Sequence, residues 1–294
     1  AHWRVVSTTP DLAWLKPDMA YDMQAVMTGS TSIVNGTPMS IYSAKGNVSD
    51  GFMVIATAHP ANTSDPDLTN WTKNPNNPIL TGKALNAQIF HDPSNIWFSR
   101  GMWRFGVRGC NRSGTESASD RSLHVYASAD LSEWTAAGPL VTLPEGTNLD
   151  CSDFFPAIVL NSDDGGRGKR SEQLYVYRYQ SNNVLVGRYD EDQQRLVDYR
   201  WPAQRLDHGT VSVGKAFWDP QHGQQVWSAW VPEGYKDCRK NCGFYSGCVN
   251  MSVCGTHTLP RTMAYDAELK HFVSEPVPQT ALLRSKLLYH STST

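Results

Sequence analysis

The feature of this sequence that most constrains its fold is an internal repeat. Three segments end in a similar pattern of Asp, Leu and Trp: S-T-T-P-D-L-A-W ends at Trp14, D-P-D-L-T-N-W at Trp71 and S-A-D-L-S-E-W at Trp134. Successive tryptophans lie roughly sixty residues apart, so a chain of 294 residues holds about five such units. The motif itself is typical of a turn in which an acid accepts backbone N–H groups while the Trp packs between sheets.

The segments between these markers have the character of short β-strands. Runs of four to seven residues rich in Val, Ile, Tyr, Phe and Trp lie at 39–43, 51–56, 102–107, 123–127, 173–179, 184–189 and 225–230. A sheet of about four strands cannot bury both faces alone, but sheets packed face to face around an axis can. The sequence therefore predicts an all-β protein, a five-bladed β-propeller, with a β-sandwich as the alternative.

The charge balance excludes several classes of partner. The chain has 26 Lys and Arg against 28 Asp and Glu, a net charge of −2, so no strong field attracts nucleic acid or an anionic membrane. The sequence also lacks the run of ~18 to 20 apolar residues that would span a bilayer. We expect a neutral small molecule as the partner, with no nucleic acid and no membrane.

Sequons and cysteines indicate an oxidising, secretory environment. The pattern Asn-x-Ser/Thr occurs at Asn35, Asn47, Asn62, Asn70, Asn111 and Asn250, and such sites belong on exposed loops. Four of the six cysteines lie at Cys238, Cys242, Cys248 and Cys254. Disulfides are favoured over zinc, because the spacing lacks a C-x₂-C pair and the nearby His257 has no second His beside it. We therefore expect no metal and a secreted, cell-wall or vacuolar protein.

Two acidic segments are candidates for chemistry. Asp92 lies in the apolar run I-F-H-D-P, and Asp150 and Asp153 lie in L-D-C-S-D-F-F-P. An ionised carboxylate in such a setting must be hydrogen-bonded, paired or facing a wet cavity. Asp150 and Asp153 point to opposite faces of an extended chain, so only one can line a given cavity. Paired carboxylates in the axial cavity of a propeller suit glycoside cleavage, and the alternative is that they only cap turns and tighten loops.

The order of these motifs resembles glycoside hydrolase family 32, the invertases and fructan hydrolases, and most of all its plant-type members. The segments that carry the resemblance are H-W with S-T-T-P-D-L-A-W at the start, M-T-G-S at 27–30, S-D-P at 64–66, W-T-K at 71–73, N-P at 77–78, F-H-D-P at 90–93, D-C-S-D-F-F-P at 150–156, D-H-G at 207–209, G-K at 214–215 and L-P-R at 259–261. The family has W-S-G-S, F-R-D-P, E-C-P-D-F-F-P and D-Y-G at the corresponding places.

The resemblance implies a five-bladed propeller and a retaining mechanism on β-fructofuranosides such as sucrose, without a cofactor. In that scheme Asp92 is the transition-state stabiliser, and Asp150 stands at the position of the Glu that acts as acid and base. His91, Thr28, Asp207 and Lys215 stand at positions expected to contact substrate. The family's nucleophile lies in a motif upstream of the His-Trp pair, so we expect it, and the first strand of blade one, upstream of Ala1.

Several departures from the family pattern leave alternatives open. Asp150 is one methylene shorter than Glu, and His91 replaces an Arg with its fixed charge and two-pronged fork. Residues 1–294 are interpreted as a single, partial propeller domain that ends before the family's C-terminal β-sandwich. We expect a β-fructofuranosidase. The alternatives are a catalytically inactive sugar-binding homologue and a related five-bladed arabinosidase or xylosidase, which the D-P to F-F-P order disfavours.

Overall fold

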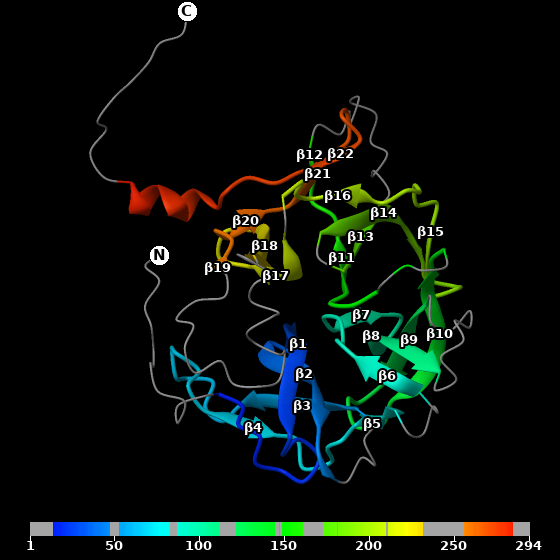
Figure 1. Ribbon diagram of the computed structural model, residues 1–294, viewed down its shortest axis with the longest axis vertical. Coiled ribbons are helices and arrows are strands. Elements are labelled where there is room, and N and C mark those ends of the chain that lie inside the picture. The colour runs from blue at the N-terminus through cyan, green and yellow to red at the C-terminus, as the bar shows by residue number, and fades with distance from the viewer. Residues whose placement is uncertain are drawn as a thin grey trace, which may run out of the picture.

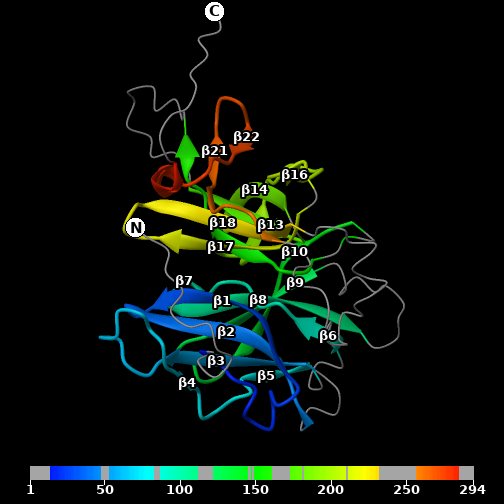
Figure 2. The same ribbon diagram turned by 60° about the vertical axis from the view of Figure 1, so that its left-hand side comes forward.

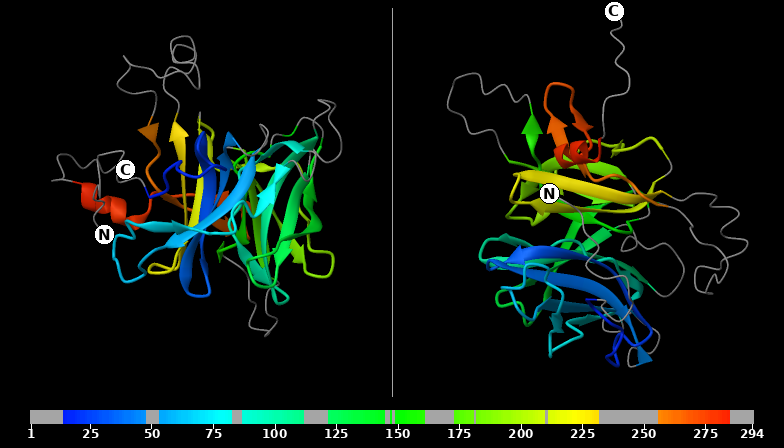
Figure 3. Two further views of the ribbon diagram at one scale, coloured as in Figure 1. Left: turned by 90° about the horizontal axis from the view of Figure 1, so that it is seen from below. Right: turned by 90° about the vertical axis from the view of Figure 1, so that its left-hand side faces the viewer.

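The protein is built almost entirely from β-strands. The computed structural model describes residues 14–47, 53–82, 87–111, 122–144, 147, 149–160, 173–180, 182–209, 211–231 and 256–284. These residues form 22 strands and a 3₁₀ helix, η5 (Pro278–Leu283). The strands make five sheets arranged in a ring (Figure 1), and they run roughly along its short axis (Figure 3, left). The prediction of an all-β, five-bladed propeller is confirmed.

The first two sheets come from the first half of the chain. One has the order β1 (Ala25–Val34), β2 (Thr37–Lys45), β3 (Val54–Pro60) and β4 (Trp71–Lys73), with β5 (Leu80–Thr81) also on β3. The next has the order β10 (Thr135–Thr142), β9 (Ser122–Ser128), β8 (Met102–Asn111) and β6 (Ala87–His91), with β7 (Trp97–Ser99) also on β8. All pairings in both sheets are antiparallel.

The other three sheets come from the second half. The third has the order β11 (Asp153–Pro156), β13 (Leu174–Tyr179), β14 (Asn183–Asp190) and β15 (Arg195–Val197), with β16 (Gln204–Arg205) on β14. The fourth has β17 (Ser212–Asp219), β18 (Gln224–Val231) and β19 (Thr256–His257), with β20 (Arg261–Thr262) on β18. The smallest has β12 (Val159–Leu160), β21 (Ala264–Asp266) and β22 (His271–Val273), in which β12 pairs parallel to β21. The fourth sheet lies beside the first, where β17 approaches β1 (Figure 2).

The local sequence signals match these strands. Each of the seven apolar runs lies in, or overlaps, one of β2, β3, β8, β9, β13, β14 and β18. Turns form at two of the D-L-x-x-W motifs, whereas the copy that ends at Trp14 lies outside the described residues up to position 13. In the copy that ends at Trp71, the acceptor is Asp65, two residues before the Asp of the motif, and it accepts the backbone N–H groups of Asp67 and Thr69 at 3.0 and 2.9 Å. In the later copy, Asp130 accepts the N–H of Ser132 at 2.9 Å. The leucine of both turns is left-handed, with φ of +47° at Leu68 and +69° at Leu131.

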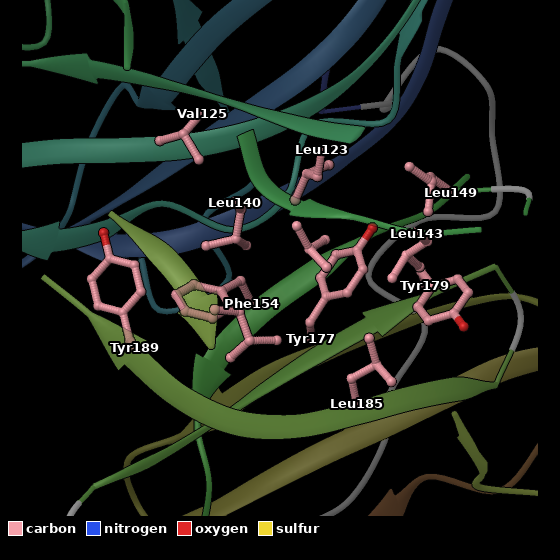
Figure 4. Packing of buried hydrophobic residues seen from close by; sticks show 12 residues of the cluster. Leu123, Val125, Leu140, Leu143, Leu149, Phe154, Tyr177, Tyr179, Leu185 and Tyr189 are labelled. Atoms are coloured by element: carbon pink, nitrogen blue, oxygen red, sulfur yellow. The ribbon is translucent and has the colours of Figure 1, made fainter. Parts of the chain in front are cut away.

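Apolar side chains fill the spaces between neighbouring sheets. Between the second and third sheets, Leu123, Val125 and Leu140 pack against Phe154, Tyr177 and Leu185 (Figure 4). A second cluster joins the first and second sheets through Ile41, Ile55, Phe90 and Phe105, and a third joins the third, fourth and smallest sheets through Val176, Val184, Trp227 and Tyr265. Burial of this apolar area on both faces of the sheets is the main force that holds the ring together.

Polar side chains join the inner strands, because in the part of the chain that the structure describes each inner strand has one edge without a backbone partner. Ser30 on β1 donates to the carbonyl of Pro93 at 3.2 Å. Asn95 bridges to β11 in both directions, accepting from the N–H of Phe154 at 2.7 Å and donating to its carbonyl at 2.5 Å. These bonds satisfy backbone groups that the sheets leave over, and they set the register of one blade against the next.

The buried carboxylate of Asp153 makes the corresponding link between the third and fourth sheets. Asp153 and Arg178 have no exposed side-chain surface, and Oδ2 of Asp153 lies 2.7 to 2.8 Å from two guanidinium nitrogens. The same oxygen accepts the N–H of Ala216 at 2.8 Å, and Oδ1 lies 2.8 Å from Nζ of Lys215. Burial opposes ionisation, but the charges of Arg178 and Lys215 outweigh it and lower the pKa of Asp153.

The described residues include only some of the sequons and cysteines. The asparagines of four sequons, Asn35, Asn47, Asn62 and Asn70, are exposed. The structure does not describe Asn250, Cys238, Cys242, Cys248 and Cys254, nor the side chains of Cys110 and Asn111. Glycosylation and disulfides therefore stay predictions. Cys151 is a buried free thiol. Among the described residues, no helix has the length and apolar character needed to cross a membrane.

The buried pair generates a prediction for stability. Replacement of Arg178 by Met should lower the free energy of unfolding by about 3 to 5 kcal/mol, because it leaves a buried carboxylate short of a partner. The matched control is Arg188→Met, which breaks the exposed pair with Asp198 (3.1 Å) and should cost less than about 1 kcal/mol. Urea unfolding followed by fluorescence measures both values. Equal losses in the two variants would contradict this account of Arg178.

Candidate active site

The inner strand of the second sheet is interrupted at Asp92. β6 ends at His91 and β7 resumes at Trp97, and both pair with the continuous strand β8. Ser94 holds the interruption against β8, donating its N–H to the carbonyl of Gly106 at 2.8 Å and accepting the N–H of Gly106 at 2.9 Å. Asp92 has φ of +57°, a left-handed conformation that is uncommon for a residue with a side chain. Such conformations persist where the surroundings impose them, often at functional sites.

Contacts from several sheets hold Asp92 in place. The residue is buried, with a relative exposure of 6%, and Oδ2 accepts the N–H of Cys151 at 3.0 Å. The same oxygen lies 3.2 Å from Nδ1 of His91. Its backbone N–H donates to Oγ of Ser43, on β2, at 2.7 Å. Asp92 is therefore both the inner-strand interruption and the contact point of the first three sheets.

The loop before β11 is clamped by cations of the third and fourth sheets. Nη2 of Arg178 donates to the carbonyl of Cys151, and Nζ of Lys215 donates to the carbonyl of Ser152 at 2.9 Å. Oγ of Ser152 bonds back to the carbonyl of Leu149 at 2.7 Å. Cys151 is also left-handed, with φ of +55°. These bonds fix a sharp turn that points the Cys151 amide at Asp92 and carries Asp150 beside it.

Asp150 completes a cluster around His91. Its Oδ1 forms an ion pair with Nη1 of Arg108 and lies 3.8 Å from Nε2 of His91. His91, Asp92 and Asp150 each offer one ligand atom, and these atoms lie within 4.8 Å of one another. The side chain of Asp150 is about one-third exposed, whereas Asp92 is buried. The fold thus places a buried and an accessible carboxylate on either side of one imidazole.

Neighbouring charges favour the ionised forms of Asp92 and His91. Burial disfavours the anion of Asp92, but the hydrogen bond and charge of His91, the Cys151 amide and the charge of Lys215 lower the pKa of Asp92 to about 2. Burial likewise disfavours the cation of His91, yet the neighbouring Asp92 and Asp150 raise the pKa of His91 above its usual value. The result is an anion, a protonatable imidazole and a second carboxylate in contact, an arrangement suited to binding sugar hydroxyls and moving protons.

The other residues expected in the site have mixed positions. Thr28 lies at a bulge of β1 between Val26 and Gly29, two residues before the Ser30 that contacts the Asp92 loop. Lys215 is bonded to Asp153 and Ser152 and so supports the loop before β11. Asp207 is held by Nη1 of Arg261 at 2.7 Å and the N–H of Gly209 at 2.6 Å. Substrate contact by these three residues stays a prediction.

The cluster of His91, Asp92 and Asp150 also has the composition of a metal site. Its carboxylates are, however, already engaged by cationic groups: Asp150 by the guanidinium of Arg108, and Asp92 by His91. These contacts favour neutral hydroxyl groups as ligands over a cation. That no metal is bound stays a prediction.

Sequence reasoning missed two arginines of this site. Arg108 lies directly opposite His91 in the β6–β8 register, one residue after the apolar run 102–107 ends. Arg178 lies inside β13, where it pairs with Asp153. The available signal was a charge within or beside a buried strand, which indicates a buried acidic partner without saying which one.

The pKa of Asp92 predicts how stability depends on pH. Its folded value of about 2 lies below the ordinary value of 3.8, so the stabilisation is fully present above pH 3.8 and is lost as the pH falls through about 2. The shift corresponds to about 2 kcal/mol. In Asp92→Asn this contribution is absent, so the difference in unfolding free energy between the two proteins should shrink by about that amount between pH 5 and pH 2. Chemical unfolding at a series of pH values tests this, and a constant difference would contradict it.

Comparisons with known proteins agree with this geometry. The family model "Glycosyl hydrolases family 32 N-terminal domain" matches residues 3–276. Among curated proteins, a fructan 6-exohydrolase of Beta vulgaris is 28% identical over 289 residues, which cover 92% of this chain and 45% of the relative. A β-fructofuranosidase, insoluble isoenzyme 1, of Oryza sativa subsp. indica is 28% identical over 291 residues, covering 92% and 47%.

Solved structures show the same relationship. Fructan 1-exohydrolase IIa of Cichorium intybus superposes with a TM-score of 0.72 at 25% identity, covering 92% of this chain and 50% of that one. A single-site variant of that enzyme, in complex with 1-kestose, superposes with a TM-score of 0.74, also at 25% identity. The chain spans about half the length of the relatives that it matches. On the family match across nearly all of its residues, the chain belongs to glycoside hydrolase family 32.

Proposed function

We propose that the protein hydrolyses β-fructofuranosides such as sucrose or fructans. The observation that carries the proposal is the meeting of Asp92 and Asp150, which come from different sheets, on the two sides of His91. Membership of family 32 supports the substrate class, since relatives are named as β-fructofuranosidases and fructan exohydrolases. The ligand is accordingly a neutral carbohydrate, in keeping with a net charge of −2.

In this proposal the two carboxylates have different roles. Asp92, buried and anionic, accepts hydrogen bonds from the fructosyl hydroxyls and strengthens them as positive charge develops on the sugar. Asp150, the accessible carboxylate, protonates the leaving oxygen and then activates water as a base. A retaining reaction also needs a nucleophile, and the proposal assigns that role to no residue of this sequence.

The place of action is proposed from the surface of the molecule. The four exposed sequon asparagines are available to a glycosyltransferase, which acts on proteins in the secretory pathway. We therefore propose a secreted, cell-wall or vacuolar enzyme.

The buried carboxylate gives the first test of this function. In the full-length protein, Asp92→Asn keeps the shape of the side chain but removes its charge, so kcat/KM for sucrose or 1-kestose should fall by about 10²- to 10³-fold. The control is Asp198→Asn, which removes a carboxylate that is 71% exposed. Chromatographic detection of released fructose measures both variants. An Asp92→Asn protein as active as the control would count against the role of Asp92.

The accessible carboxylate, Asp150, gives the second test of this function. Asp150→Asn should lower kcat by about 10²- to 10⁴-fold, since an amide cannot exchange a proton with the leaving group. Binding of fructose should change little, because the contacts of Asp92 remain. Turnover assays and isothermal titration calorimetry separate the two effects. If Asp150→Asn retains full turnover, another group is the acid.

A second candidate function is sugar binding without cleavage. It is favoured by the Asp at position 150, one methylene shorter than the expected Glu, and by the engagement of its Oδ1 by Arg108. In that case the full-length protein binds sucrose without releasing fructose, and Asp150→Glu gains turnover. Fructose release by the unaltered protein rejects this second function.

A further inference from the structure

We propose that Arg108 is the positioning residue for the Asp150 carboxylate, and that it supplies the guanidinium that the family pattern places at position 91. The inference rests on the proposed function, because it assigns Asp150 a role in turnover. It concerns a residue that no motif of the resemblance contains.

The sheet register explains how Arg108 can take this place. His91 on β6 and Arg108 on β8 are directly opposed partners in an antiparallel pair. The Cβ atoms of such partners lie only about 4.5 to 5.5 Å apart, so long side chains from the two positions reach a common space. A guanidinium carried by β8 therefore substitutes for one carried by β6. In this chain position 91 holds the imidazole and position 108 holds the guanidinium.

Both groups converge on one atom of Asp150. Nη1 of Arg108 forms an ion pair with Oδ1, and Nε2 of His91 lies 3.8 Å from the same oxygen. The guanidinium is largely covered, with a side-chain exposure of 16%, whereas that of Asp150 is 31%. A covered cation holding a partly exposed anion restricts rotation of the carboxylate, which would otherwise sample several rotamers at the end of a loop.

The position of Arg108 on strand β8 suits it for holding the Asp150 carboxylate. β8 is an interior strand, and the backbone of Arg108 pairs with His91 on one side and with Leu123 of β9 on the other. Asp150, by contrast, precedes β11 and sits on the turn formed by Cys151 and Ser152. The rigid sheet thus orients the carboxylate on the loop. The orientation of this carboxylate matters, because a displacement of about 1 Å costs on the order of a hundredfold in rate.

The charges around Arg108 explain why its guanidinium pairs with Asp150. Arg108 forms an ion pair with Asp150, and His91, its partner in the sheet register, lies between Asp150 and Asp92. Lys215 and Arg178 form ion pairs with Asp153. Asp150 is hence the carboxylate that Arg108 engages, and a change at position 108 should act on Asp150 before any other site residue.

The test compares three variants of the full-length protein. In Arg108→Gln, kcat for sucrose or 1-kestose should fall by about a hundredfold while KM changes less than about threefold, since substrate binding relies on Asp92. Arg108→Lys keeps the charge without the planar fork and should recover part of the loss. The control Arg188→Gln breaks the exposed pair with Asp198 and should leave both constants unchanged. A merely structural role for Arg108 would lower unfolding stability without this split between kcat and KM.

A crystal structure of Arg108→Gln supplies a readout that does not depend on turnover. The Asp150 carboxylate should be displaced or occupy more than one rotamer, with Asp92 and His91 unmoved. An undisplaced Asp150 would overturn the proposal, as would an unchanged kcat in an active protein. If the unaltered protein cleaves no fructoside, the proposed function fails, while the position of Asp150 in the variant still decides whether Arg108 holds it.

Discussion

The structure depends on one buried carboxylate. Asp153 has no exposed surface, and it is satisfied by Arg178 from its own sheet and by Lys215 and the Ala216 amide from the next. The cations that neutralise it also bond the carbonyls of Cys151 and Ser152, so the same charges that join two blades fix the turn before β11. A buried anion needs this many partners because desolvation is costly. The blade junction and the site geometry are consequently a single feature.

That turn determines where the candidate active site lies. Left-handed backbone at Asp92 and Cys151 brings a carboxylate and an amide from different sheets into contact at 3.0 Å. Conformations of this kind cost of order 1 to 3 kcal/mol each, and the surrounding hydrogen bonds maintain them. The pKa of Asp92 falls to about 2 because the site provides donors that outweigh burial. A preorganised anion of this type can act on a substrate without rearrangement of the protein.

The propeller explains why the candidate site lies beside structural contacts between the sheets. Inner strands of separate sheets have no backbone partners across the blade junctions, so polar side chains such as Ser30, Asn95 and Asp153 bridge them. Family 32 membership supports the proposed class of chemistry, and the pairing of Asp150 with Arg108 adds an ion pair to the candidate site.

The sequence by itself determined the all-β architecture, the repeat of sheets and the turns at the two motifs that end at Trp71 and Trp134, because strand alternation and turn chemistry are local. It also marked Asp92 and Asp150, since acids are costly in apolar segments. Only the tertiary structure decided that Asp150 meets Arg108, that Asp153 is buried beside Arg178 and that Lys215 supports it. Those pairings depend on strand register and on which blades adjoin, and both arise from contacts between residues far apart in the chain.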